Sequence, residues 1–155
     1  MSIELDDGKA ESRATAALPT DQRHAALGGG APDPALAALY FNFGRYLLIN
    51  SSRPGTMPAN LQGIWAEGIQ TPWNCDYHAN INLQMNYWPA EPTGLAECAE
   101  PLVDFLLAQS EPCRQATRKA FGASTRGWTA RTSQSPFGGN AWEWNIPASA
   151  WYALH

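Results

Sequence analysis

Apolar residues recur with the spacing of an α-helix in one long segment early in the chain. Between residues 33 and 50 they lie three or four positions apart, at Leu36, Leu39, Tyr40, Phe43, Tyr46 and Leu47. This period predicts a helix from Asp33 to Asn50 with one apolar face. Asp33 can cap its first turn, Pro34 suits the first helical position, and Pro54-Gly55 cannot continue the helix.

Shorter helices are predicted further along the chain, each bounded by proline or glycine. They are expected at His78–Trp88, at Glu100–Gln109, at Pro112–Phe121, and from Pro147 to His155. Strand signals are weak throughout the sequence. The pattern therefore predicts an all-α fold.

The segment from Arg53 to Asp76 is predicted to be an ordered loop. Its three prolines and three glycines exclude a long helix, and it also holds Trp65 and Trp73. Loops of this length without regular structure are uncommon in compact domains and are often functional.

Residues 1–32 are expected to form a tail or linker that leads into a helical domain over residues 33–155. The segment is rich in alanine, glycine and charge, and it ends in a run of three glycines, with only a weak indication of a short helix at Asp21–Leu27. The last predicted helix has no stop signal before His155. We therefore expect the chain to be part of a longer protein whose core these helices do not complete.

Composition narrows the class of protein. Apolar residues make up 45% of the chain and charged residues 15%, which is typical of a globular protein. The net charge of −4 and the scattered basic residues give no reason to expect nucleic acid or an anionic membrane as a partner. No apolar run approaches the roughly 20 residues of a membrane span. The N-terminus lacks the pattern of a signal peptide, and the compartment is left open, secretion and the periplasm included.

The cysteines and histidines do not predict a metal centre. Cys75, Cys98 and Cys113 are an odd number without CxxC spacing, which argues against a disulfide framework and a zinc site. His78 and Asp76 are of the right ligand types, but no further ligand follows at metal-binding spacing. The serines lack a GxSxG motif. We predict no metal and no cofactor.

Seven tryptophans and a polar run from Trp73 to Trp88 point to a polar ligand. Indole rings suit the flat C–H faces of sugars, although a single tryptophan is more often a core residue. The run holds His78 and four asparagines among apolar residues, and amides can hold a water or sugar hydroxyls because they both donate and accept. A buried amide network or helix capping remains an equal alternative. On a helix, His78, Asn82 and Asn86 would share one face.

Carboxylates that could serve in catalysis lie near tryptophans or loops. The candidates are Glu67, Asp76, Glu91 and Glu143. Each is more often a solvated or structural acid than a catalyst. Glu143 is the best of them, because the flanking Trp142 and Trp144 could shield it from water.

Several blocks of the sequence resemble glycoside hydrolase family 95. Residues 58–65 read PANLQGIW, residues 78–91 read HANINLQMNYWPAE, and residues 142–147 read WEWNIP. Further similar blocks are residues 18–21, 44–49, 51–56 and 127–128. The resemblance covers residues 18–155.

The resemblance implies a six-hairpin, (α/α)6 barrel, of which residues 33–155 would form an incomplete N-terminal part. It implies inverting hydrolysis of α-1,2-L-fucosyl linkages, in which Asn80 and Asn82 hold the attacking water. The general-acid glutamate and the assisting aspartate of the family lie further along than this chain extends, so Glu143 is not given either role.

We accordingly predict a substrate site made of two kinds of residue. Asn80 and Asn82 are the catalytic candidates, and the oligosaccharide contacts are His78, Trp65, Trp73, Asn86 and Trp144. The isolated chain is expected to be inactive and to expose apolar faces that invite self-association. Two alternatives stay open: an α-L-galactosidase of the same family, and a non-catalytic carbohydrate-binding helical module. A purely structural helical domain leaves the polar run from residue 78 to residue 86 unexplained.

Overall fold

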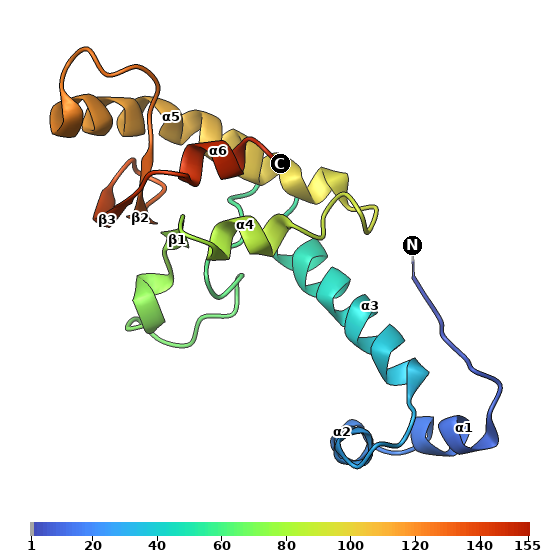
Figure 1. Ribbon diagram of the computed structural model, residues 1–155. Helices are drawn as coiled ribbons and strands as arrows, with labels where there is room; N and C mark the ends of the chain where they lie inside the picture. Colours follow the sequence, from blue (N-terminus) through green and yellow to red (C-terminus); the bar gives the residue numbers. More distant parts are fainter. Residues whose placement is uncertain (1) are drawn as a thin grey trace. The chain divides into compact units, whose positions relative to one another are not determined.

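The computed structural model describes residues 2–155 (Figure 1) and divides into two compact units on either side of the bond between Leu47 and Leu48. The elements, in chain order, are α1 (Ala10–Ala16), α2 (Thr20–Gly28), α3 (Pro34–Ser51), the 3₁₀ helix η1 (Pro72–Cys75), β1 (Tyr77–His78), α4 (Asn82–Tyr87), the 3₁₀ helix η2 (Ala96–Ala99), α5 (Glu100–Phe121), β2 (Ala130–Gln134), β3 (Asn140–Asn145) and α6 (Ala148–Tyr152). Helices dominate, as predicted, but the expectation of an all-α fold was incomplete.

A small antiparallel sheet in the second unit has the strand order β1-β2-β3. Tyr77 lies opposite Gln134, and His78 lies opposite Ser133. The pairing of β2 with β3 shifts register between Arg131 and Ser133. The strands escaped sequence analysis because β1 has two residues and because β2, although its burial alternates, carries polar side chains at two of its three buried positions, Thr132 and Gln134.

The first unit contains α1, α2 and most of α3. The Arg23 guanidinium donates two hydrogen bonds, of 2.8 and 2.9 Å, to the Asp33 carboxylate. Asp33 Oδ1 also accepts the Leu36 N–H at 2.9 Å, which confirms that this residue caps α3. The Arg23 hydrogen bonds hold the pKa of the Asp33 carboxyl below its usual range.

Two helices, α1 and α2, lie within residues 1–32, which were expected to form a tail or linker. The weak helix signal at Asp21–Leu27 is confirmed by α2, whereas α1 was not predicted. The boundary drawn between residues 32 and 33 stays a prediction.

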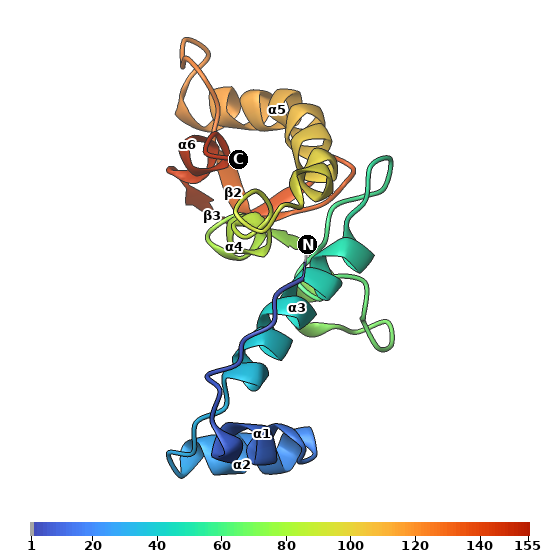
Figure 2. The ribbon, with the colours of Figure 1, turned by 90° about the vertical axis from the view of Figure 1, so that its right-hand side faces the viewer.

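One continuous helix of 22 residues, α5, replaces the two predicted at Glu100–Gln109 and Pro112–Phe121. Pro112 lies inside it, although proline removes a helical hydrogen bond. The buried stripe of the helix runs on both sides of this position, at Leu102, Phe105, Gln109, Cys113 and Thr117. Packing along this stripe holds the helix through the proline, so the sequence boundary was wrong. Both views show α6 beside α5 (Figure 2); α6 begins after Pro147 as predicted but ends at Tyr152, short of His155.

The helix predicted at His78–Trp88 begins only at Asn82. The Ala79 N–H donates to the Thr132 carbonyl at 2.7 Å, which holds the turn that follows β1 beside β2. The Ala79 carbonyl in turn accepts 2.6 and 2.7 Å hydrogen bonds from Gln84 Nε2 and Asn145 Nδ2. The prediction that His78 shares a helix face with Asn82 and Asn86 was therefore wrong, because His78 lies in β1.

The core of the second unit gathers around Tyr87 of α4, which is fully buried. The Ser52 hydroxyl donates to the Cys98 carbonyl at 2.8 Å, so the Tyr87 hydroxyl is the donor in its 2.7 Å contact with Ser52. The Tyr87 oxygen also accepts the Ala59 N–H at 2.7 Å. One side chain thereby ties the end of α3 to the following loop and to η2.

Within residues 2–155, none of the helices combines the length and the hydropathy that crossing a membrane requires.

Replacing Tyr87 by phenylalanine should lower the free energy of unfolding by about 1–3 kcal/mol, because the buried Ala59 N–H and Ser52 hydroxyl each lose a partner. Urea denaturation followed by circular dichroism measures the change. Tyr77→Phe is the matched control, because its hydroxyl makes a single 3.3 Å bond to the Pro58 carbonyl. Equal losses in the two variants would contradict the assignment of Tyr87 as the central hydrogen-bonding residue.

Alkaline pH should destabilise the protein through the same residue. Burial raises the pKa of Tyr87 from its ordinary value of 10.0 to about 12, so the folded chain holds a proton that the unfolded chain releases. The associated stability is complete below about pH 10 and is lost as the pH rises toward 12. Urea midpoints measured across this range should fall less steeply in Tyr87→Phe than in the unmodified protein, and parallel curves would refute the claim.

Candidate functional site

A cavity of about 390 Å³ opens in the second unit where the long loop meets β1 and α4. Its walls are formed by Leu61, Gln62, Trp73, His78, Asn80 and Asn82. Four of these six residues are predicted site residues, and the structure brings them together. The lining combines amides, an imidazole and an indole, and none of the six side chains is a carboxylate.

A left-handed turn positions Trp73 at this cavity. Trp73, Asn74 and Cys75 have φ angles of 48°, 57° and 56° in succession. This conformation costs about 1–2 kcal/mol per residue for side chains other than glycine, and such strain is frequent at functional sites. The loop ends are held because the Leu61 N–H donates to the Asp76 carbonyl at 3.2 Å. Trp73 keeps 62% of its surface exposed, which leaves indole available to a ligand.

Gln62 is a residue of the cavity that sequence reasoning missed. Its Nε2 donates to the Pro72 carbonyl at 3.3 Å, whereas its Oε1 is buried without a hydrogen-bond partner among the described residues. A buried acceptor without a partner is costly unless a ligand or water supplies the donor. The block at residues 58–65 pointed to this segment, but the sequence alone did not single out its glutamine.

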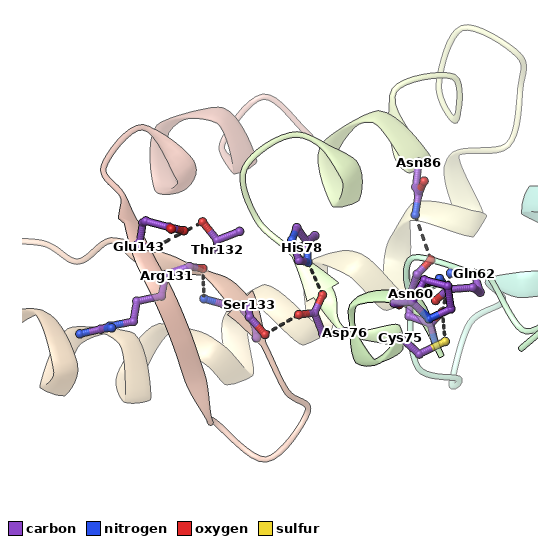
Figure 3. Close-up of polar contacts among 12 residues, drawn as sticks. Asn60, Gln62, Cys75, Asp76, His78, Asn86, Arg131, Thr132, Ser133 and Glu143 are labelled. Atoms are coloured by element: carbon purple, nitrogen blue, oxygen red, sulfur yellow. Dashed lines mark hydrogen bonds and ion pairs between the residues drawn. The ribbon is translucent and has the colours of Figure 1, made fainter. Parts of the chain in front are cut away.

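Asp76, His78 and Ser133 form a hydrogen-bonded row beside the cavity, in which Asp76 and His78 are buried and Ser133 is partly buried (Figure 3). Asp76 Oδ1 bonds to His78 Nδ1, and the Ser133 hydroxyl donates to Asp76 Oδ2. The side chains of His78 and Asp76 are only 8% and 7% exposed. The pairing of β1 with β2 sets this row, because it places His78 opposite Ser133. Within the described part of the chain, no three histidine, cysteine or acidic residues cluster as metal ligands would.

Trp142 of β3 also belongs beside the cavity, and sequence reasoning missed it. Its ring meets the His78 ring edge-on, with centroids 5.0 Å apart and an interplanar angle of 80°. Its backbone is left-handed, with φ of 69°, and its carbonyl accepts a 2.7 Å hydrogen bond from Arg131 Nη1. The shifted register of the hairpin determines which of the two tryptophans faces His78, and the sequence does not reveal that shift.

Three other predicted contacts lie outside the cavity lining. Trp65 covers Gly63, where a Cβ atom would come within 2.8 Å of its ring. Asn86 Nδ2 donates to the Asn60 carbonyl at 3.2 Å and so fastens the loop. Trp144 packs edge-on against Phe121, with ring centroids 5.1 Å apart, and under the Arg131 guanidinium. Their roles as substrate contacts stay predictions.

The acidic candidates occupy different surroundings. Glu67, Glu91 and Glu143 are exposed. The idea that neighbouring tryptophans shield Glu143 from water is therefore wrong. Asp76 is buried, but both of its oxygens are engaged by His78 and Ser133. It is thus placed to orient another group.

Amides, an imidazole and an exposed indole around one open cavity are groups that suit a polar, hydroxyl-rich ligand such as a sugar. The sequence agrees with this class. Residues 1–155 match the Glycosyl hydrolase family 95 catalytic domain, and the chain belongs to this family.

Relatives of known description carry fucosidase names. The chain is 47% identical to Alpha-L-fucosidase 2 of Arabidopsis thaliana over 130 residues, which cover 79% of this chain and 15% of the relative. It is 42% identical over 129 residues to a Probable alpha-fucosidase A of Aspergillus niger, covering 79% of this chain and 16% of the relative. The matching protein of Aspergillus oryzae, of the same description, is 41% identical over 106 residues, or 68% of this chain and 14% of the relative. The matched part thus spans only 14–16% of the length of these relatives.

Proposed function

We propose that this chain forms one wall of the substrate cleft of an inverting α-L-fucosidase that hydrolyses α-1,2-L-fucosyl linkages in oligosaccharides. The proposal rests on one observation, which is that Trp73, His78, Asn80 and Asn82 line the same cavity. Membership of glycosyl hydrolase family 95 and the fucosidase names of the relatives support it.

Asn80 and Asn82 would position the water that attacks the sugar. A carboxamide offers a donor and an acceptor, so two of them can fix both the place and the orientation of one water. An amide is too weak a base to take the proton, and an inverting enzyme also needs an acid on the opposite face of the bond. No carboxylate lines the cavity. The two proton-transferring groups would come from a part of the enzyme outside residues 2–155.

Trp73 and His78 would hold the sugar beside that water. The exposed indole supplies an apolar face for the C–H groups of a pyranose ring. His78 and Gln62 supply polar atoms for hydroxyl groups. The same groups suit L-galactose, which differs from L-fucose by one hydroxyl, so the choice between the two sugars falls to contacts on that carbon.

Residues 33–155 would be the N-terminal part of an (α/α)6 barrel, with residues 1–32 leading into it. An apolar groove of about 520 Å³ between α5 and α6 supports this proposal. It is lined in part by Val103, Leu107, Trp128 and Tyr152. Val103 and Leu107 are 41% and 67% exposed, as expected of a surface against which further helices of a barrel pack. In the isolated chain this groove would favour self-association.

L-fucose should bind to the isolated chain weakly, and Trp73→Ala should reduce that binding at least tenfold, because the indole face is the largest apolar surface offered to the sugar. Saturation-transfer NMR measures the binding of L-fucose and, for comparison, the binding of L-galactose to each variant. Trp88→Ala is the matched control, since Trp88 is a half-exposed tryptophan that packs edge-on against His155 and does not line the cavity. A loss in the control with none in Trp73→Ala would refute the cavity as the sugar site.

The isolated chain should not hydrolyse a 2'-fucosylated oligosaccharide. General acid and base assistance are each worth ~10²–10⁴-fold, and the cavity supplies neither. Release of L-fucose from the oligosaccharide, measured with purified chain and with Asn82→Ala, tests this. Turnover above background that disappears in Asn82→Ala would show that a carboxylate of this chain, Glu143 foremost, acts as the acid.

A further inference from the structure

We infer that Asp76 is a positioning residue for His78: it fixes the neutral imidazole with its proton on Nδ1, so that Nε2 faces the ligand as a hydrogen-bond acceptor. Ser133 takes part by holding the carboxylate. The identity of the ligand as a sugar hydroxyl rests on the proposed function. The arrangement of the three side chains does not.

The chemistry of the carboxylate sets the tautomer. An ionised carboxylate can only accept hydrogen bonds, so a ring nitrogen bonded to it must carry the proton. Asp76 Oδ1 bonds to Nδ1 of His78, and a neutral imidazole has only one proton to place. Nε2 is therefore left with its lone pair free. A carboxylate that orients a histidine in this way is a recurring device at sites where the imidazole must meet a ligand in one state.

The backbone and neighbouring rings prevent the pair from rearranging. Ser133 Oγ donates to the second oxygen of Asp76, across a distance of 57 residues in sequence, and the pairing of the two strands places it there. Asp76 consequently cannot rotate without breaking two bonds. The edge of Trp142 packs against the imidazole, and both side chains of the pair are more than nine-tenths buried. Rotation of the ring by 180° would carry Nδ1 away from its acceptor.

The result is a cavity wall that accepts hydrogen bonds at two points. Gln62 lines the same cavity, and its Oε1, buried and without a partner in the described residues, is a second acceptor. A ligand group that meets them must be a donor, as a free hydroxyl is and an ether oxygen is not. The wall therefore selects an unsubstituted hydroxyl of the bound sugar at this place.

The tautomer can be read directly by NMR in the 155-residue chain without any ligand. Long-range ¹H–¹⁵N correlation spectra at about pH 7.5–9, where an ordinary imidazole is neutral, distinguish the nitrogen that carries the proton. His24 and His155 serve as internal references, and His78→Gln assigns the remaining signal. We expect His78 to be protonated on Nδ1 alone. A proton on Nε2, or on both nitrogens, would overturn the proposal.

Variants then separate orientation from packing. Asp76→Ala should move the proton to Nε2, the preferred position in an imidazole without a partner, while Ser133→Ala keeps the carboxylate and should leave it on Nδ1. Asp76→Leu preserves the side-chain volume and should behave as Asp76→Ala does. An unchanged tautomer in either Asp76 variant with a native amide spectrum would overturn the proposal.

Failure of the proposed function has a different signature. L-fucose and its fully O-methylated derivative, added to the unmodified chain, probe the ligand. If His78 has the expected tautomer and L-fucose binds no better than the methylated sugar, the positioning stands and the fucoside assignment fails. If L-fucose binds and the Asp76→Ala signal still reports Nδ1, the assignment stands and the positioning fails.

Discussion

Hydrogen bonds to the backbone of Ala79 determine the geometry of the site more than any other interaction. The residue is fully buried, its N–H is bound by the Thr132 carbonyl, and its carbonyl is shared by Gln84 and Asn145. These bonds hold Ala79 against β2 as the first residue of the turn that follows β1, so that α4 begins only at Asn82. Because the chain turns between the strand and the helix, His78, Asn80 and Asn82 reach one cavity from different backbone conformations.

The fold shows which sequence signals were sufficient. The helix at α3 was predicted because its apolar period, its aspartate cap and its Pro-Gly stop all agree. Proline misled the analysis at Pro112, where burial of the residues on both sides outweighs the local preference. The strands β1 and β2 were missed because their stability comes from each other, and a two-residue strand has no period of its own.

The residues of the candidate site likewise divide into those that the sequence revealed and those that it did not. The unusual residue types of the polar run and of the tryptophan-bearing loop pointed to His78, Asn82 and Trp73, and the resemblance to glycoside hydrolase family 95 added Asn80. Gln62 and Trp142 were missed because their relevance depends on a loop closing back on η1 and on an irregular strand register. Asp76 was considered as a metal ligand or an acid, and only its position between His78 and Ser133 reveals an orienting part. Long-range pairing of this kind is not encoded in spacing along the chain.

The reach of these contacts in sequence has a consequence for how the protein forms. Helices such as α3 and α5 need only neighbours within a few residues, and such elements form within about a microsecond. The turn that carries Asn80 is fixed by Asn145, which lies 66 residues beyond Ala79. Bringing the two ends of a segment of that length together costs chain entropy before any contact between them forms. During synthesis on the ribosome, therefore, the cavity cannot acquire its native shape until the whole hairpin of β2 and β3 has left the exit tunnel, long after its own lining residues have emerged.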